Sequence, residues 1–193
     1  MRDLRLVLAS QSPRRRELLT TAGFQFTIRA SAVEEVRAAG EAPEVYARRL
    51  AQQKAEAAWQ AGPRSADEVV LGADTIVVLG NIVLEKPDGP ASARSMLEQL
   101  SGREHVVITG VCLRHASGVE VAAESTLVKF APLSAEEIDE YVASGEPMDK
   151  AGAYAIQGLA SKFVERVDGC FFNVVGLPLA LVYRKLQEIG ALR

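Results

Sequence analysis

The sequence predicts an α/β protein with a mixed β-sheet and flanking helices. Segments with strand-like and helix-like patterns alternate along the 193 residues. The alternation is broken by a hairpin signal at Gly80-Asn81 and by two long strand-like runs in succession, at 105–114 and 119–130. Because alternation favours parallel strands joined through helices and hairpins favour antiparallel neighbours, both kinds of strand pairing are expected.

Capping and turn residues mark the boundaries of the predicted elements. Ser12 followed by Pro13 is typical of a helix start, and Gly23 of a helix end. Ser134 with Glu137 three residues later is a capping box. The predicted elements in chain order are a strand over 4–9, the helix between Ser12 and Gly23, a strand over 24–30, a helix over 43–61, strand runs over 69–73 and 75–79 separated by Asp74, the hairpin return over 82–86, a helix over 90–100, the strands over 105–114 and 119–130, a helix over 134–143, a loop over 145–158, a strand over 163–167 and a helix over 178–189.

Length and composition are typical of one soluble globular domain over residues 1–193. Hydrophobic residues make up 48% of the chain, and no apolar run approaches the ~20 residues of a membrane span. The net charge of −3 argues against a nucleic-acid binder, because such proteins need a surplus of Lys and Arg. The first apolar run is too short for a secretory signal, and Cys112 and Cys170 are interpreted as buried hydrophobic residues, so the cytoplasm is expected.

The first stretch with chemical character is ASQSPRRRELL, where a predicted strand runs into a helix. A helix N-terminus presents free backbone N–H groups and the positive end of the helix dipole, and both favour a bound anion. Arg14 and Arg15 stand where an unliganded helix prefers acidic residues, so with Ser10 they are candidates for binding phosphate. The alternative is a solvated basic turn.

The second stretch is LGADTIVVLGNIVLEKP, over residues 71–87. Asp74 stands inside an apolar strand-like run, where an unpaired buried carboxylate is costly, and Glu85-Lys86 lies across the predicted hairpin. A carboxylate at the end of a strand can bind a hard cation or take a proton from water. The alternative is an Asp in a bulge that bonds backbone N–H groups.

The third stretch is DKAGAYAIQGLASKF, over residues 149–163. Its glycines, Gly152 and Gly158, indicate a close-fitting loop. Tyr154 and Gln157 can meet a nucleobase there through its face and its edge. The alternative is a connecting loop that contains a packed tyrosine.

Together these stretches resemble the motifs of the Maf family of nucleoside triphosphate pyrophosphatases. ASQSPRRRELL resembles the opening S-x-S-P-R-R motif, GADTIVV with LEKP resembles the central acidic motif, and DKAGAYAIQG followed by VVGLPL resembles the C-terminal signature. The resemblance covers nearly the whole chain. It implies an elongated mixed α/β fold like that of the inosine triphosphate pyrophosphatases, with two lobes around a cleft. It also implies hydrolysis of a nucleoside triphosphate between the α and β phosphates with a divalent cation, Mg²⁺ or Mn²⁺.

The resemblance implies roles for individual residues. Asp74 matches the family's proton acceptor, with Lys54 and Lys86 as supporting catalytic residues. Glu34, Asp74 and Glu85 are the implied metal ligands, and whether Asp74 acts as base or as metal ligand stays open. The implied substrate-binding residues are Ser10, Arg14, Arg15, Thr75 and Gln157.

DKAGAYAIQG resembles the branch of the family that acts on dTTP and UTP, in which Gln157 is associated with base choice together with Arg14 and Thr75. A branch that acts on 7-methyl-GTP tends to carry an acid at this position. An amide can both donate and accept toward the O4 and N3–H edge of thymine or uracil, whereas a carboxylate only accepts. Ala155 departs from the family's AYGIQG, and it fits only if its φ is not positive.

The resulting hypothesis is a pyrophosphatase for dTTP and UTP, with modified pyrimidine nucleotides as further substrates. One alternative is a 7-methyl-GTP pyrophosphatase. Another is a non-catalytic, nucleotide-binding regulator of cell division. The nucleoside triphosphate is the expected partner, with no nucleic acid and no membrane, and a homodimer is compatible with the sequence.

Overall fold

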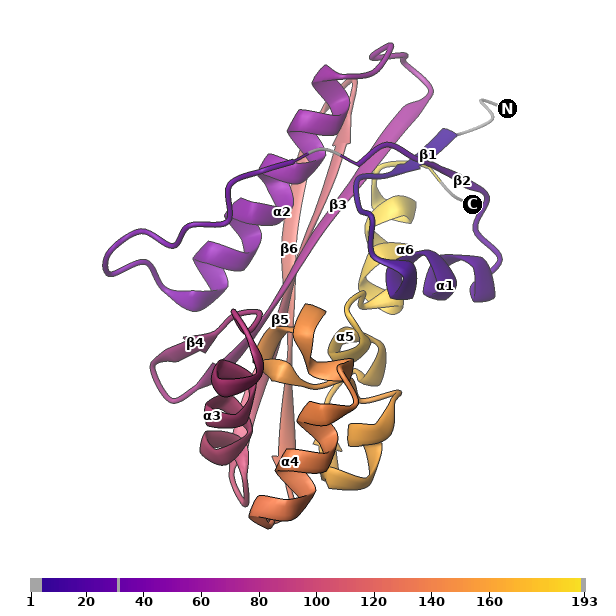
Figure 1. The fold of residues 1–193 in the computed structure, drawn as a ribbon. Helices are drawn as coiled ribbons and strands as arrows, with labels where there is room; N and C mark the ends of the chain where they lie inside the picture. Colours follow the sequence, from indigo (N-terminus) through magenta and orange to yellow (C-terminus); the bar gives the residue numbers. More distant parts are fainter. Residues whose placement is uncertain (1–4, 31, 192–193) are drawn as a thin grey trace. The chain divides into compact units, whose positions relative to one another are not determined.

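The computed structural model describes residues 5–30 and 32–191 and confirms the predicted alternation of strands and helices (Figure 1). The strands are β1 (Arg5–Leu8), β2 (Phe26–Ile28), β3 (Glu68–Leu79), β4 (Ile82–Leu84), β5 (Glu104–His115), β6 (Gly118–Phe130) and β7 (Val164–Asp168). The α-helices are α1 (Pro13–Thr21), α2 (Pro43–Gln60), α3 (Pro90–Leu100), α4 (Ala135–Ala143), α5 (Phe171–Val175) and α6 (Leu179–Glu188). Short 3₁₀ helices are η1 (Glu146–Asp149), η2 (Ala151–Ala153) and η3 (Leu159–Phe163).

The strands form one mixed sheet, as predicted. Its strand order is β2-β1-β3-β5-β6-β7, and β4 pairs with β3 outside this path. β1 runs parallel to both β2 and β3, whereas β4 is antiparallel to β3 and β7 is antiparallel to β6. The combination of parallel and antiparallel pairs confirms the predicted fold class.

Several predicted caps and turns are confirmed. The Ser12 side chain caps α1, and Pro13 is the first residue of that helix. Ser134 and Glu137 form the predicted capping box, with the Ser134 N–H donating to Glu137 Oε2 at 2.8 Å. Gly80, in the turn between β3 and β4, has a φ of 60°, a conformation that glycine adopts without steric cost.

The structure differs from the predicted elements in three places. The predicted break at Asp74 was wrong, because β3 continues through this residue from Glu68 to Leu79. The predicted loop over 145–158 contains η1 and η2, and the five-residue helix α5 was not predicted. Helical turns this short carry too few residues to show the periodic apolar pattern that reveals longer helices.

The described chain forms two compact units. The first is drawn from Met1–Asp74, Thr109–Glu124 and Gly176–Arg193 and contains α1, α2 and α6. The second is drawn from Thr75–Ile108 and Ser125–Val175 and contains α3, α4 and α5. Across residues 5–30 and 32–191, no helix combines the length and the apolar character needed to cross a bilayer.

In the first unit, α2 lies directly against the sheet (Figure 1). One face of this helix carries a stripe of small buried residues: Ala47, Ala51, Ala55 and Ala58. A Cβ at Gly72 of β3 would overlap the carbonyl oxygen of Ala51, and a Cβ at Gly110 of β5 would overlap that of Ala47. The missing side chains therefore let the helix backbone approach the two strands closely.

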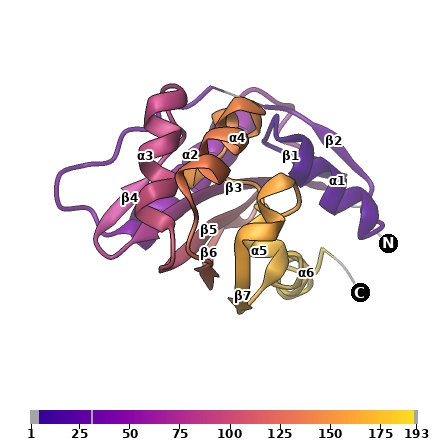
Figure 2. The ribbon, with the colours of Figure 1, turned by 60° about the horizontal axis from the view of Figure 1, so that its bottom comes forward.

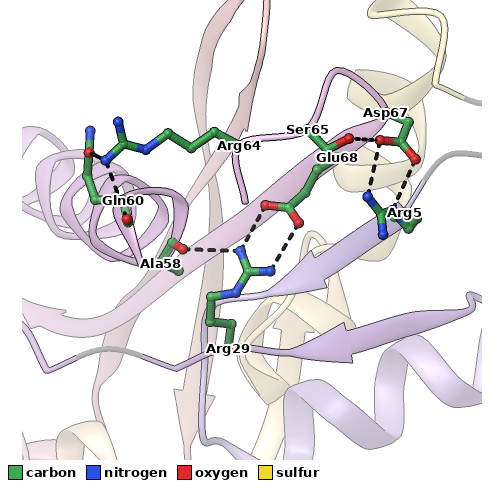
Figure 3. Close-up of polar contacts among 8 residues, drawn as sticks. All are labelled: Arg5, Arg29, Ala58, Gln60, Arg64, Ser65, Asp67 and Glu68. Carbon is green, nitrogen blue, oxygen red and sulfur yellow. Dashed lines mark hydrogen bonds and ion pairs between the residues drawn. The ribbon is translucent and has the colours of Figure 1, made fainter. Parts of the chain in front are cut away.

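Ion pairs fasten the ends of elements in the first unit (Figure 3). Arg29, which follows β2, donates to both carboxylate oxygens of Glu68 at 2.8 and 3.0 Å and to the carbonyl oxygen of Ala58 at 3.2 Å. Glu68 is buried at the start of β3. Arg29 thus joins three elements, namely the chain after β2, the start of β3 and the C-terminal part of α2.

In the second unit, α3 and α4 lie side by side (Figure 2). An aromatic cluster fills the interior, in which the rings of His105, Phe130 and Tyr154 contact one another edge to face. His105 Nε2 lies 2.8 Å from Tyr154 Oη. Burial lowers the pKa of His105 to about 4, so the imidazole is neutral at pH 7.

Candidate active site

The candidate site in the first unit begins where β1 ends. Leu8 pairs with Leu71, and the Ala9 N–H donates to the Leu71 carbonyl at 2.8 Å, so the chain that leaves β1 runs beside the middle of β3. Ser10 follows, and its Oγ accepts the Ser12 N–H at 3.2 Å and Arg15 Nη1–H at 3.2 Å. Since its oxygen is the acceptor in both bonds, the hydroxyl hydrogen can donate to a ligand, and its donation to phosphate stays a prediction.

Arg15 is buried in the first turn of α1 and binds oxygens from three parts of the chain. Its Nη1 donates to the Ala73 carbonyl at 2.8 Å as well as to Ser10, and its Nε donates to the Gly176 carbonyl at 2.8 Å. The guanidinium therefore links the ends of β1 and α1 to β3 and to the chain before α6. A contact of Arg15 with substrate stays a prediction.

The three consecutive arginines differ in exposure. Arg14 is half-buried, Arg15 is buried and Arg16 is exposed. Successive helical side chains point about 100° apart, so the three cannot all face one ligand. Binding of phosphate by Arg14 stays a prediction, as it does for Arg15.

Lys54 of α2 joins two carboxylates at the centre of this site. Its Nζ lies 2.6 Å from Asp74 Oδ1 and 2.5 Å from Glu35 Oε1. The side chains of Lys54 and Asp74 are 13% and 8% exposed, so their charges are largely removed from water. Burial lowers the pKa of the nearby Arg15, while the charges of Asp74 and Glu35 act in the opposite direction. The Asp74 carboxylate thus contacts an ammonium, and its residue lies within β3.

The structure adds Glu35 to the predicted site. The family resemblance implies Glu34 as a metal ligand, but Glu35 is the residue whose carboxylate meets Lys54. Glu34 is exposed. The motif could not distinguish these two consecutive glutamates, because both offer the same chemistry and the choice depends on which one faces Lys54.

In the second unit, the hairpin carries two predicted site residues. Glu85 and Lys86 directly follow β4, and both are exposed. The carbonyl oxygen of Glu85 accepts the Gly152 N–H at 3.1 Å, which ties the central motif to the C-terminal signature. Gly152 has a φ of 68°, and a Cβ there would press against the side chain of Val77. Because Gly152 has no side chain, its backbone can lie close to the side chain of Val77.

Thr75 and Gln157 are the remaining predicted residues of the second unit. Thr75 follows Asp74 on β3 and is half-buried, and Gln157 is exposed in a turn. Ala155 was expected to fit only if its φ is not positive. This condition is met, because the described non-glycine residues with positive φ are Arg64 and Ala153. The close fit predicted for this loop is found at Gly152 and Gly158, where an added Cβ would overlap Val77 and Glu146, respectively.

The carboxylates of the first unit suit a hard cation. Asp74 and Glu35 supply the oxygen ligands that Mg²⁺ and Mn²⁺ prefer, and both reach the same Nζ of Lys54. Within residues 5–30 and 32–191, no three side chains of His, Cys, Asp or Glu are grouped so as to hold a metal ion. Mg²⁺ is commonly held by one or two carboxylates together with substrate phosphates, and this donor set fits that pattern. The ligand set Glu34, Asp74 and Glu85 stays a prediction.

The arrangement can carry out anion binding and proton transfer. The Ser10 hydroxyl and the N-terminus of α1 offer hydrogen-bond donors, and Lys54, which is paired with Asp74, supplies a positive charge. Asp74 offers a carboxylate that can accept a proton from water. These are the groups required to attack a phosphoanhydride with water.

Comparison with known proteins finds relatives along nearly the whole chain. A family model described as Maf-like protein matches residues 5–189. A dTTP/UTP pyrophosphatase of Koribacter versatilis is 50% identical over 187 residues, covering 97% of this chain and 95% of that protein. A dTTP/UTP pyrophosphatase of Geobacter sulfurreducens is 51% identical over 190 residues, covering 97% of this chain and 98% of that protein.

Among solved structures, the Ham1 protein of Staphylococcus aureus has a similar fold. The TM-score is 0.55 at 14% sequence identity, and the match covers 95% of this chain and 98% of that chain. At this identity the likeness concerns the fold alone. It agrees with the predicted α/β class.

Proposed function

This chain belongs to the family of Maf-like proteins, and from that premise we propose that it is a nucleoside triphosphate pyrophosphatase acting on dTTP and UTP. Water attacks the α-phosphorus, the bond to the bridging oxygen breaks, and the products are the nucleoside monophosphate and pyrophosphate. The substrate assignment is supported by the relatives that carry this name at about half identity over nearly their whole length. Modified pyrimidine nucleotides are further substrates within the same proposal.

The observation that carries the chemistry is the largely buried pair of Asp74 and Lys54. Asp74 takes the proton of the attacking water, and Lys54 holds the carboxylate in place and offers positive charge to the phosphates. Ser10 donates its hydroxyl hydrogen to a phosphate oxygen, next to the N-terminus of α1. Arg14 neutralises charge on the triphosphate.

We further propose that the enzyme works with Mg²⁺ or Mn²⁺. Asp74 and Glu35 would hold the cation together with phosphate oxygens, in keeping with their shared contact to Lys54. When bound, such a cation neutralises the developing charge of the phosphates. The contributions proposed for Glu34, Glu85 and Lys86 rest on the sequence motifs.

Base choice is assigned to Gln157, with Arg14 and Thr75 as accompanying residues. The exposed amide of Gln157 can donate to O4 and accept from N3–H of a thymine or uracil. A cytosolic location belongs to the same proposal and is supported by the free thiols of Cys112 and Cys170. A homodimer and a cleft between two lobes stay predictions.

The test is release of pyrophosphate from dTTP, UTP and 7-methyl-GTP, with and without Mg²⁺ or Mn²⁺, by the wild type and by Asp74→Asn. Asp74→Asn keeps the shape of the side chain and removes its charge, so we expect turnover to fall at least ~10²-fold with the fold intact. The matched control is Asp88→Asn, which makes the same aspartate-to-asparagine change at an exposed residue of the second unit. This variant should hydrolyse the nucleotides like the wild type.

The other outcomes identify the alternatives. Near-normal hydrolysis by Asp74→Asn would refute the role of this carboxylate. Activity confined to 7-methyl-GTP would favour the methylated purine nucleotide over dTTP and UTP. Nucleotide that stays bound and unconsumed in the presence of the metal would favour the regulator of cell division.

A further inference from the structure

The turn that carries Gln157 is held at both ends by two side chains of the second unit. The Gly158 N–H donates to the Ala155 carbonyl at 3.0 Å, which closes a β-turn with Gln157 at its third position. The Ala155 N–H donates to Tyr141 Oη at 3.2 Å. The Leu159 N–H donates to Glu146 Oε2 at 3.1 Å.

Tyr141 and Glu146 are themselves joined. Tyr141 Oη–H donates to Glu146 Oε1 at 2.9 Å, so the two residues form a continuous hydrogen-bonded bridge between the two sides of the turn. We call this pair the Tyr141–Glu146 clamp. Its two backbone contacts, at Ala155 and Leu159, lie two residues before and two residues after Gln157.

The clamp is built on fixed elements. Tyr141 is buried in α4 and its ring packs edge to face on Phe163 at 5.5 Å between centroids. Burial, followed by the bond to Glu146, raises the pKa of Tyr141 above its usual value, so the phenol stays protonated and can donate. The Glu146 backbone is held by Ser144 Oγ, which accepts its N–H at 3.2 Å, and by Lys150 Nζ, which donates to its carbonyl at 3.2 Å.

Gly158 is shaped to this arrangement. A Cβ at Gly158 would overlap the carboxylate of Glu146, so a side chain at this position would push the clamp away from the turn. The absence of a side chain lets Glu146 reach Leu159. Residues other than glycine can adopt the φ of −103° found at Gly158, so the backbone conformation does not explain the glycine of the signature. This glycine is therefore explained by the space that it leaves for the contact with the clamp.

We propose that Tyr141 and Glu146 are positioning residues that set the preference for a pyrimidine base by holding the turn that presents Gln157. This inference rests on the proposed function. An amide discriminates the O4 and N3–H edge only when its donor and its acceptor are both placed correctly, and small errors of placement weaken both bonds. Fixing the backbone on each side of Gln157 limits the directions in which its amide can point.

The first experiment measures kcat and KM for dTTP, UTP and GTP with Tyr141→Phe and Glu146→Gln. Tyr141→Phe removes both bonds of the hydroxyl, so we expect KM for dTTP and UTP to rise about 10-fold with kcat within about 3-fold, and the preference over GTP to fall about 10-fold. Glu146→Gln keeps one acceptor oxygen and should lose less than Glu146→Ala. Glu140→Gln changes an exposed acid of α4 and is the control.

A double-mutant cycle separates positioning from general structural damage. If the clamp acts through Gln157, then Tyr141→Phe combined with Gln157→Ala should lose no more base preference than Gln157→Ala alone. Additive losses in this cycle would overturn the positioning role. Unchanged KM and base preference in folded Tyr141→Phe and Glu146→Ala would also overturn it, while leaving the proposed function standing.

Amide hydrogen exchange tests the clamp without reference to activity. In Tyr141→Phe the Ala155 amide should exchange about 10-fold faster, and in Glu146→Ala the Leu159 amide should do so. Wild-type exchange rates in these variants would overturn the clamp whatever the enzyme hydrolyses. A wild type that hydrolyses neither dTTP nor UTP would instead overturn the proposed function, and with it the link between the clamp and pyrimidine choice.

Discussion

The ammonium of Lys54 lies 2.6 Å from a carboxylate oxygen of Asp74, and neither side chain is more than 13% exposed. Removing one member of such a pair leaves the other charge buried without its partner, which costs about 3 kcal/mol in comparable cases. We therefore expect Lys54→Met to lower the free energy of unfolding by about that amount in urea titrations. We also expect pyrophosphate release to fall at least ~10²-fold at temperatures where the variant is folded.

Lys54→Arg is the companion variant, because it keeps a positive charge within reach of the same carboxylate. It should retain more stability than Lys54→Met. If Lys54→Met unfolds at the same urea concentration as the wild type, the ion pair does not contribute to stability and its place in the site must be reconsidered.

Glu35 and Glu34 form a matched pair for testing which glutamate belongs to the site. Both residues are exposed, and Glu35 Oε1 is the carboxylate oxygen that meets Lys54, at 2.5 Å. We expect Glu35→Gln to reduce turnover at least ~10-fold and to raise the metal concentration needed for half-maximal activity, since a carboxylate next to Asp74 is lost. Glu34→Gln should have the smaller effect. The reverse order would restore Glu34 as the ligand that the family motif implies.

Two neighbouring ion pairs of the first unit differ in burial and should differ in their contributions to stability (Figure 3). Arg29 bonds Glu68, which is 3% exposed, whereas Arg5 is 59% exposed where it bonds Asp67. Arg29→Met should lower the free energy of unfolding by about 3 kcal/mol, because Glu68 is left charged and buried. Arg5→Met should cost less than about 1 kcal/mol. Equal losses in urea titrations would contradict this reading.

The sequence predicted elements best where a cap or a turn residue marks them. The helix over Pro90–Leu100 was predicted with both of its ends, and the start of α1 follows from Ser12 and Pro13. Asp74 misled the prediction of β3, because a carboxylate in an apolar run suggests an interruption unless its partner is known. That partner, Lys54, comes from a different element of the chain.

The composition of the site could be predicted only in part for the same reason. The motifs pointed to Asp74 and Lys54 separately, but their contact depends on how closely α2 approaches β3, which Gly72 permits. The clamp residues Tyr141 and Glu146 carried no signal of their own, because their role follows from hydrogen bonds to the backbone at Ala155 and Leu159. Sequence patterns report side-chain chemistry and local propensity, and they do not report such long-range backbone contacts.

His105 should make stability depend on pH between 7 and 4.5. Burial lowers its pKa from 6.5 to about 4, so below pH 6.5 the unfolded state takes up a proton that the folded state does not. Stability therefore falls with pH from 6.5 until the folded imidazole titrates near 4, by about 2 kcal/mol at pH 4.5. His105→Gln should flatten this slope in urea titrations, whereas His115→Gln, which changes the other of the two histidines, should keep it. A slope that survives His105→Gln would assign the pH dependence to other groups, since the buried neighbour Tyr154 has a pKa raised by burial and does not titrate in this range.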